Sequence, residues 1–379
     1  MSADFDVLVV GAGLMGSATA WSAARRGATV AVLEQFGPHH TMGSSHGRAR
    51  IVRRAYGDAL YAGLTGRAFE LWRELELSND VHLLRQLGAL DFGRRRDVAT
   101  LAEHLAAVSV PHEVMDSVEA ERRWPGMRFS GPVVFHQQAG TVDPEAAVDA
   151  FVNDARRHGA QVQFDAAVQS IAVRGEQLVE VRTDDDAITA RRVVLAPGPW
   201  LTQLAAGLAP LPELLVTQQH IAHFPRLDPS EPPWPSVIHD DEPAAMYHLA
   251  GGDVGMVADD RKVGRHDGGT VTSGVPLDRS LDPSASAELT EYVRRWLPGL
   301  DPTPRNEATC LYTSTPSEDF VLDTVGPLVV CSACSGHGAK FAPLVGELAA
   351  DLALAAGAAV PDRFRLWAHR APQIGGVSL

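Results

Sequence analysis

The stretch that decides the fold is Val7-Leu8-Val9-Val10-Gly11-Ala12-Gly13-Leu14-Met15-Gly16. Its first four residues are apolar and predict a buried strand, and the small and apolar side chains of residues 17–26 predict a helix that ends at Gly27. A second strand is predicted over residues 29–33, and it leads into Glu34. A strand, a Gly-x-Gly-x-x-Gly loop, a helix, a second strand and an acidic residue in this order predict a dinucleotide-binding fold.

Each glycine of this motif has its own physical task. Gly11 allows the tight turn, Gly13 lets the backbone approach a pyrophosphate at the helix N-terminus, and Gly16 lets the helix pack closely on the strand. Glu34 is placed to hydrogen-bond a ribose hydroxyl. The motif by itself does not distinguish FAD from NAD. The residues predicted to bind the dinucleotide in this region are Gly11, Ala12, Gly13, Met15, Gly16 and Glu34.

Composition excludes several classes of function. The chain has 379 residues and a formal net charge of -14, which argues against a nucleic-acid partner, and the Arg94-Arg95-Arg96 run is interpreted as a solvated face. No apolar stretch is long enough to span a bilayer, so no membrane association is predicted. Three cysteines are too few for a disulfide scaffold, and the acidic start lacks a secretory n-region. These features favour a cytoplasmic location.

The chain is predicted to fold as two interleaved domains of α/β class, α+β overall. Residues 81–142 and 214–313 are richer in Pro, His and aromatic residues, and their short strand-like runs predict an antiparallel sheet. We assign these two ranges to a substrate domain. The dinucleotide-binding domain then comprises residues 1–80, 143–213 and 314–379. Within it, Asp143-Pro144-Glu145 has the form of a helix start, and the Ala-rich residues 344–358 predict another helix.

Lysine is rare in this chain. Lys262 and Lys340 are the two lysines among 33 Lys and Arg residues. Lysine is a compact ammonium that can lose its proton when desolvated, so arginine does not replace it at a reacting centre. The alternative is that both survived by chance in an Arg-biased composition. The pair Cys331 and Cys334 has metal-ligand spacing but no second pair, so we interpret it as strand packing and predict no metal site.

Three further segments match one pattern. They are Gly43-Ser44-Ser45-His46-Gly47-Arg48-Ala49-Arg50-Ile51-Val52-Arg53-Arg54-Ala55-Tyr56, then Thr309-Cys310-Leu311-Tyr312-Thr313, then Ser335-Gly336-His337-Gly338-Ala339-Lys340-Phe341. Together with the N-terminal motif they resemble the monomeric sarcosine oxidase and N-methyltryptophan oxidase family of D-amino-acid-oxidase-like flavoproteins, essentially from end to end. The resemblance implies a Rossmann-like FAD-binding domain, a monomer, and Ser44, Arg50, Gly336 and Gly338 beside the cofactor.

For Cys310 the resemblance implies a covalent thioether to the 8α carbon of the flavin, because a thiolate is a good nucleophile. Considered alone, Cys310 would more often be an inert buried thiol.

The same resemblance implies a different role for each of the two lysines. Lys262 is implied to activate oxygen beside the flavin, where its ammonium stabilises developing negative charge. The stretch before it, residues 251–261, looks longer than usual, and a strand-edge charge that prevents edge pairing is the alternative. Lys340, with Arg53, is implied to bind the substrate carboxylate, because two cations fix its orientation by charge-assisted hydrogen bonds.

The remaining pocket residues are also implied by resemblance. His266 lines the substrate pocket in a binding or electrostatic role, although alone it would more often be a structural histidine. Tyr247 and Tyr312 match aromatic wall positions, with core packing as the alternative. Leu249 stands where relatives carry an aromatic residue, so we expect a wider pocket and a substrate larger than sarcosine or of different shape.

The predicted function is oxidation of a secondary amino acid, sarcosine or another N-methyl amino acid. A hydride equivalent passes to flavin N5, the imine product hydrolyses, and oxygen is reduced to hydrogen peroxide. Within the class, the alternative is an oxidase of a cyclic imino acid such as pipecolate or proline, in a biosynthetic pathway. An NAD-dependent dehydrogenase shares the N-terminal fold but has no use for Cys310, and a flavin dehydrogenase with another acceptor remains open. The sequence does not decide between hydride and radical routes.

Overall fold

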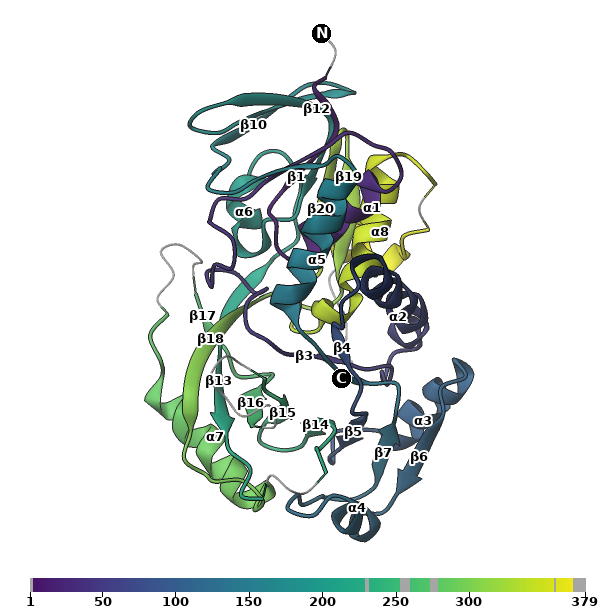
Figure 1. Ribbon diagram of the computed structural model, residues 1–379, viewed down its shortest axis with the longest axis vertical. Helices are drawn as coiled ribbons and strands as arrows, with labels where there is room; N and C mark the ends of the chain where they lie inside the picture. Colours follow the sequence, from purple (N-terminus) through teal and green to yellow (C-terminus); the bar gives the residue numbers. More distant parts are fainter. Residues whose placement is uncertain (1–2, 229–231, 253–259, 273–278, 358, 371–379) are drawn as a thin grey trace.

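The computed structural model describes residues 3–228, 232–252, 260–272, 279–357 and 359–370. Within these residues the chain forms two large sheets and one small sheet. The first large sheet lies in the upper half of Figure 1 and the second in the lower half. Two sheets, each with its own core, agree with the predicted α/β class, while the domain boundaries themselves stay a prediction.

The first sheet is built on the N-terminal motif. Strand β1 lies at its centre and pairs in parallel with β2 and β12, which is the arrangement of a dinucleotide-binding sheet. In spatial order its strands are β10 (Ser170–Gly175), β11 (Leu178–Arg182), β12 (Ala187–Leu195), β1 (Phe5–Val10), β2 (Val30–Leu33) and β9 (Gln161–Gln163), with β20 (Leu328–Ser332) paired to β12 and β19 (Val321–Val325) paired to β20.

The second sheet is mainly antiparallel, and it draws its strands from residues 89–136 and 215–314. Its spatial order is β17 (Thr270–Val271), β13 (Leu215–Phe224), β16 (Arg261–Arg265), β15 (Ala245–Ala250), β14 (Ser236–Asp240), β5 (Ala89–Phe92), β7 (Val133–His136) and β6 (His112–Met115), with β18 (Arg305–Ser314) also paired to β13. A small sheet of β3 (Arg50–Val52), β8 (Gly140–Val142) and β4 (Leu84–Arg85) lies where the two meet.

Aspartate begins most of the longer helices. In five of them an Asp at the N-cap accepts a hydrogen bond from a backbone N–H of the first turn, which satisfies a donor that the helix leaves free. These helices are α2 (Ala59–Asn79), α3 (Val98–Ala107), α4 (Ser117–Arg123), α5 (Pro144–Arg157) and α7 (Pro283–Trp296). The helix start predicted at Asp143-Pro144 is therefore confirmed. The short α6 (Leu201–Leu204) has no such cap.

Helix α1 (Leu14–Ala24) follows directly after Gly13 of the glycine motif and packs against α5 and α8 (Ala342–Ala353). It begins three residues earlier than predicted, because Gly13 already serves as its N-cap and the first turn lies inside the motif. Helix α8 ends before the predicted limit at residue 358, which itself lies outside the described residues. Helix α1 is almost wholly buried, so its small residues allow neighbouring helices to approach closely.

One close approach gives a test of this packing. A Cβ at Gly346 in α8 would overlap the backbone and side chain of Ala18 in α1. We expect Gly346→Ala to lower the free energy of unfolding by about 1–3 kcal/mol, because the two helices would have to separate. Urea unfolding of the purified protein measures this change.

Gly63 in α2 is the matched control, because it is exposed within a helix and a Cβ there would meet no atom within 4 Å. Gly63→Ala is expected to raise the free energy of unfolding by about 0.5–1 kcal/mol through helix propensity alone. Equal stability changes in the two variants would contradict the close packing of α1 on α8.

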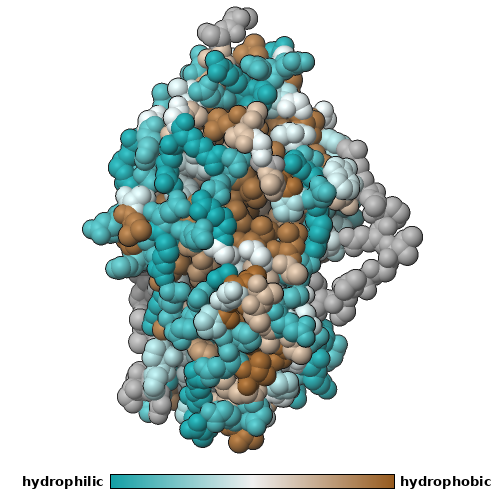
Figure 2. All heavy atoms as spheres, turned by 90° about the vertical axis from the view of Figure 1, so that its right-hand side faces the viewer, coloured by the Kyte–Doolittle hydropathy of each residue, from teal (hydrophilic) through white to brown (hydrophobic). Residues whose placement is uncertain are grey.

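No helix in the described ranges is long and apolar enough to cross a membrane. On the face drawn in Figure 2, hydrophobic residues gather near the middle and polar residues surround them.

Candidate active site

One large cavity of about 920 Å³ is lined by residues of both large sheets. Of the predicted site residues, Gly16 alone is not on its wall; it lies in α1, where a Cβ would overlap the carbonyl oxygen of Gly11. The cavity wall contains Gly11, Ala12, Gly13, Met15, Glu34, Ser44, Arg50, Arg53, Tyr247, Lys262, His266, Cys310, Tyr312, Gly336, Gly338 and Lys340.

At one end of the cavity, the backbone is arranged for a dinucleotide. Gly13 precedes α1 and has no side chain to cap it, although the Leu14 N–H donates to the Ser45 hydroxyl at 3.0 Å; the N-terminal end of the helix thus faces the cavity, where an anion is favoured. Glu34, at the end of β2, accepts a hydrogen bond of 2.7 Å from the backbone N–H of Ala12 and thereby holds the glycine loop. A Cβ at Gly338 would overlap the carbonyl oxygen of Ala333, so a larger residue could not bring this backbone to the cavity. These residues fit FAD, for which the motif provides the pyrophosphate and ribose contacts.

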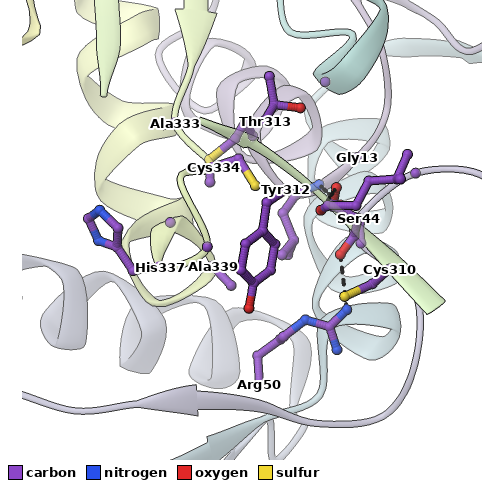
Figure 3. Close-up of a pocket in the computed structure, with 18 of the residues that line it drawn as sticks. Gly13, Ser44, Arg50, Cys310, Tyr312, Thr313, Ala333, Cys334, His337 and Ala339 are labelled. Atoms are coloured by element: carbon purple, nitrogen blue, oxygen red, sulfur yellow. Dashed lines mark hydrogen bonds between the residues drawn. The ribbon is translucent and has the colours of Figure 1, made fainter. Parts of the chain in front are cut away.

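Further along the cavity, Arg50 organises the loop that carries Ser44. Nη2 of Arg50 donates hydrogen bonds to the carbonyl oxygens of Ser44, at 3.0 Å, and His46, at 2.8 Å. The Ser44 hydroxyl in turn donates to the carbonyl of Leu311, at 2.6 Å, next to Cys310 in β18. Figure 3 shows the Arg50 guanidinium beside the Cys310 thiol, with the Tyr312 ring pointing into the same space. A buried thiol beside a guanidinium on the cavity wall is suited to a covalent attachment.

Lys262 lies in a central strand. Strand β16 pairs with β13 on one side and β15 on the other, so the alternative of a strand-edge charge is wrong. The side chain is buried, and Nζ donates a hydrogen bond of 3.3 Å to the carbonyl oxygen of Ala49. Of the longer stretch predicted before it, residues 253–259 lie outside the described residues.

Lys340 lies in the turn that precedes α8. Its Nζ donates a hydrogen bond of 2.7 Å to the carbonyl oxygen of His337 and lies 5.5 Å from the ring centre of Tyr56. Burial, followed by the positive charge of Arg53, lowers the pKa of Lys340 well below its usual value. An anion bound beside Lys340 would raise its pKa again and favour the protonated ammonium. Lys340 is therefore suited to bind an anion.

Arg53 belongs to a buried ion cluster that the sequence reasoning missed. Its Nη1 lies 3.6 Å from Oδ1 of Asp91, which is fully buried in β5, and Arg96 lies on the same oxygen with Nη2 at 2.6 Å. The interpretation of the Arg94–Arg96 run as a solvated face is therefore wrong for Arg96, whose side chain is 13% exposed and lines the cavity. An acidic residue inside the apolar run of β5 was the available signal, because such a charge needs a buried partner.

Arg279 was also missed. It donates hydrogen bonds to the carbonyl oxygens of Thr41 and Met42 and, at 3.2 Å, to that of Thr309. It therefore joins the loop before Ser44 to the strand that carries Cys310. Nothing in its local sequence marked it, since its partners lie far away in the chain.

The remaining predicted residues form a second wall of the cavity. The rings of His266 and Tyr312 lie 5.7 Å apart between centres, and Tyr247 and Tyr312 share a side-chain hydrogen bond. Burial first, then the charges of Lys340 and Arg53, lower the pKa of His266 to about 4, so the imidazole is neutral near pH 7. Leu249 is buried on the same wall. Cys331 is buried in β20, as strand packing predicts, while Cys334 follows the strand, and both cysteines line the cavity.

The fold and the cavity define a dinucleotide-binding protein whose cavity is lined both by the glycine motif and by strands of the second sheet. Comparison with known proteins makes this specific: the chain belongs to the family of FAD dependent oxidoreductases, whose model matches residues 6–352. It is 35% identical to monomeric sarcosine oxidase of Streptomyces avermitilis, over 95% of this chain and 96% of that protein. It is 30% identical to N-methyl-L-tryptophan oxidase of Yersinia pestis, over 92% of this chain and 94% of the relative. The predicted family is thus confirmed, and the chain is an FAD-dependent amine oxidoreductase.

Solved structures agree on the fold. The chain superposes on NikD, described as an unusual amino acid oxidase essential for nikkomycin biosynthesis, with a TM-score of 0.83 and 27% identity, over 99% of both chains. L-proline dehydrogenase of P. horikoshii shares the fold with a TM-score of 0.83 at 20% identity, over 97% of this chain and 98% of that one. The fold class is therefore confirmed.

Proposed function

We propose that the protein is an oxidase of a secondary amino acid, with sarcosine or another N-methyl amino acid as the substrate class. The observation that carries the proposal is the meeting of Arg53, Lys340 and Lys262 with the Cys310 thiol on one cavity. When bound, FAD supplies the redox chemistry, taking a hydride equivalent from the carbon next to the amine nitrogen and returning the electrons to oxygen as hydrogen peroxide. The relatives' names, monomeric sarcosine oxidase and N-methyl-L-tryptophan oxidase, support this substrate class.

The protein's own side chains divide the work. Arg53 and Lys340 bind and orient the substrate carboxylate by charge-assisted hydrogen bonds. Neutral His266, with Tyr247 and Tyr312, lines the space for the rest of the substrate. The positive charges of Arg53, Lys340 and Lys262 favour binding of the amine in its neutral form. Lys262 provides a fixed positive charge for the oxygen step.

Peroxide formation tests the overall reaction. A peroxide-coupled screen of N-methyl amino acids, cyclic imino acids and Amadori compounds in air should give turnover with the first group. Flavin reduction by substrate without peroxide would instead indicate a dehydrogenase with another acceptor. Turnover confined to cyclic imino acids would favour the second candidate, which is supported by Leu249 on the cavity wall, a side chain smaller than the aromatic residue expected there.

Covalent attachment of the flavin through Cys310 is part of the proposal. We expect acid precipitation of the wild-type protein to leave yellow colour in the pellet, because a thioether survives denaturation. Cys310→Ser should release its flavin into the supernatant. Absorbance of the two fractions measures this. Cys331→Ser is the matched control, because it removes another buried thiol from the same cavity wall and should keep the flavin in the pellet. Flavin in the supernatant of the wild-type protein would contradict the attachment.

We propose that the protein is a cytoplasmic monomer. The small number of cysteines is consistent with the reducing cytoplasm, and the relatives named monomeric sarcosine oxidase support a monomer. Size-exclusion chromatography with light scattering determines the oligomeric state.

A further inference from the structure

The proposed carboxylate site contains more positive charge than one carboxylate needs. Arg53, Arg96 and Lys340 all line the cavity, and all three are largely buried. Asp91 is the carboxylate that stabilises the charged forms of both Arg53 and Lys340. If Lys340, Arg53 and Arg96 are all charged, three cations share the single buried carboxylate of Asp91. Since uncompensated buried charge is costly, a ligand with a single carboxylate would leave one positive charge unbalanced.

Arg96 is held so that part of its guanidinium remains available. Nε and Nη2 donate to Oδ1 of Asp91, at 3.1 and 2.6 Å. Within the described residues, Nη1 has no hydrogen-bond partner. A guanidinium anchored on one edge has little conformational freedom left, so it can bind a second acceptor with its other edge at small entropic cost.

Two other acidic residues of the cavity wall, Asp97 and Glu318, bear on the charge of Arg96. Asp97 caps α3 and accepts from the backbone N–H and the hydroxyl of Thr100. Glu318 also faces the cavity, and its pKa is raised by burial and by the negative charges of Asp267 and Asp319. The charge of Glu318 also acts on Tyr56, as the charges of Arg53 and Arg96 do, but among the described residues its carboxylate forms no ion pair with Arg96.

The position of Arg96 also places it near the proposed reacting centre. Its charge acts on His266 and on Tyr56, the same two groups that experience the charge of Arg53. Suppose that the ligand's first carboxylate lies between Arg53 and Lys340. Arg96 can then contact a second group of the same ligand, a few bonds away from that carboxylate. A substrate with a neutral group near Arg96 would lack the charge-assisted hydrogen bond that a carboxylate could accept from Nη1.

We propose that the substrate carries a second carboxylate, on its side chain or N-substituent, and that Arg96 binds it. The substrate class would then be N-substituted amino dicarboxylates. This inference rests on the proposed function, because it takes the carboxylate site of Arg53 and Lys340 as its starting point.

Paired substrates that differ by one charge test the inference. The flavin-loaded enzyme should oxidise N-methylglutamate with a kcat/KM roughly 10- to 100-fold higher than its isostere N-methylglutamine, as expected for one buried charge-assisted contact. Arg96→Gln should abolish this preference while changing kcat/KM for N-methylglutamine by less than about threefold. Arg94→Gln is the matched control. Arg94 belongs to the same run of arginines, but its side chain is 69% exposed, pairs with Asp241 and does not line the cavity.

A binding measurement separates anion recognition from turnover. Isothermal titration with succinate and with its monoamide succinamate should show tighter binding of succinate to the wild type, and equal binding of both to Arg96→Gln. The inference is overturned if the wild type binds or oxidises the two members of each pair equally. Equal losses for both members in Arg96→Gln would also overturn it, because Arg96 would then only position Arg53 through Asp91. Thermal melting and flavin content identify a misfolded variant, and in that case the wild-type substrate pairs decide.

Failure of the inference can be told apart from failure of the proposed function. Peroxide from N-methyl monocarboxylates without any preference for dicarboxylates would uphold the proposed function and reject the inference. Absence of peroxide and of flavin reduction with every secondary amino acid would reject the proposed function, and the succinate titration would still decide whether Arg96 binds an anion.

Discussion

Lys262→Met is expected to slow reoxidation of the reduced enzyme by oxygen by about 100- to 1000-fold, the usual effect of removing one fixed charge from a reacting centre. The buried Lys262 ammonium lies on the cavity wall, where low polarity strengthens its attraction for negative charge that develops on oxygen. The rate of flavin reduction by substrate should change much less, because substrate binding uses Arg53 and Lys340. Stopped-flow absorbance of the two half-reactions measures both rates.

Two variants control this experiment. Lys262→Arg keeps the charge but spreads it over a larger planar group, and it should not restore the oxygen rate because the two side chains present different donors. Lys340→Met removes the other lysine and should leave reoxidation unchanged. If Lys262→Met slows both half-reactions equally, or if Lys262→Arg is fully active, the proposed oxygen role is contradicted.

Lys340→Met is expected to weaken binding of the substrate carboxylate by about 10- to 100-fold, because one of two charge-assisted contacts is lost. Met has a similar length and can keep the packing against Tyr56 and Phe341, both near Nζ of the lysine. The effect should therefore appear in KM and in the dissociation constant of a carboxylate inhibitor more than in kcat. Steady-state kinetics and inhibitor titration measure it.

The pH dependence gives a second readout for Lys340. Its pKa is lowered by burial and by Arg53, so the neutral form is reached at a lower pH than for an exposed lysine. A carboxylate binds the protonated form, so affinity should be high below the lowered pKa and fall as pH rises through it. This decrease should disappear in Lys340→Met. A decrease of the same size in the variant would assign the titration to another group.

The sequence was sufficient to predict the dinucleotide-binding half of the fold. The Gly-x-Gly-x-x-Gly loop, the strand before it and Glu34 are neighbours in the chain, and their tasks are local: a turn, an open helix N-terminus and a strand end. The start of α5 at Asp143-Pro144 was predictable for the same reason, because a cap acts within one turn. The family resemblance extended this local reasoning to the residues placed beside the cofactor.

The sequence could signal that Asp91 needs a buried partner, but it could not identify Arg53 and Arg96 as the partners. Asp91 occupies a short apolar strand, Arg53 follows β3, and Arg96 belongs to a run of arginines that favoured a solvated interpretation. The carboxylate meets both guanidinium groups because β5 lies within the second sheet while the Arg53 segment leaves the small sheet beside it. A charge run does not indicate which of its members is buried, and pairing across distant segments is a tertiary property.

The sequence by itself was enough to predict a dinucleotide-binding fold and to single out the two lysines as candidates, because glycine loops, caps and rare residue types are read from short stretches of chain. The tertiary structure alone decided that β16 is a central strand, that Lys262 is therefore buried, and that Arg53, Arg96 and Lys340 meet at one cavity. The physical reason is that burial and electrostatic coupling depend on which distant segments fold against each other.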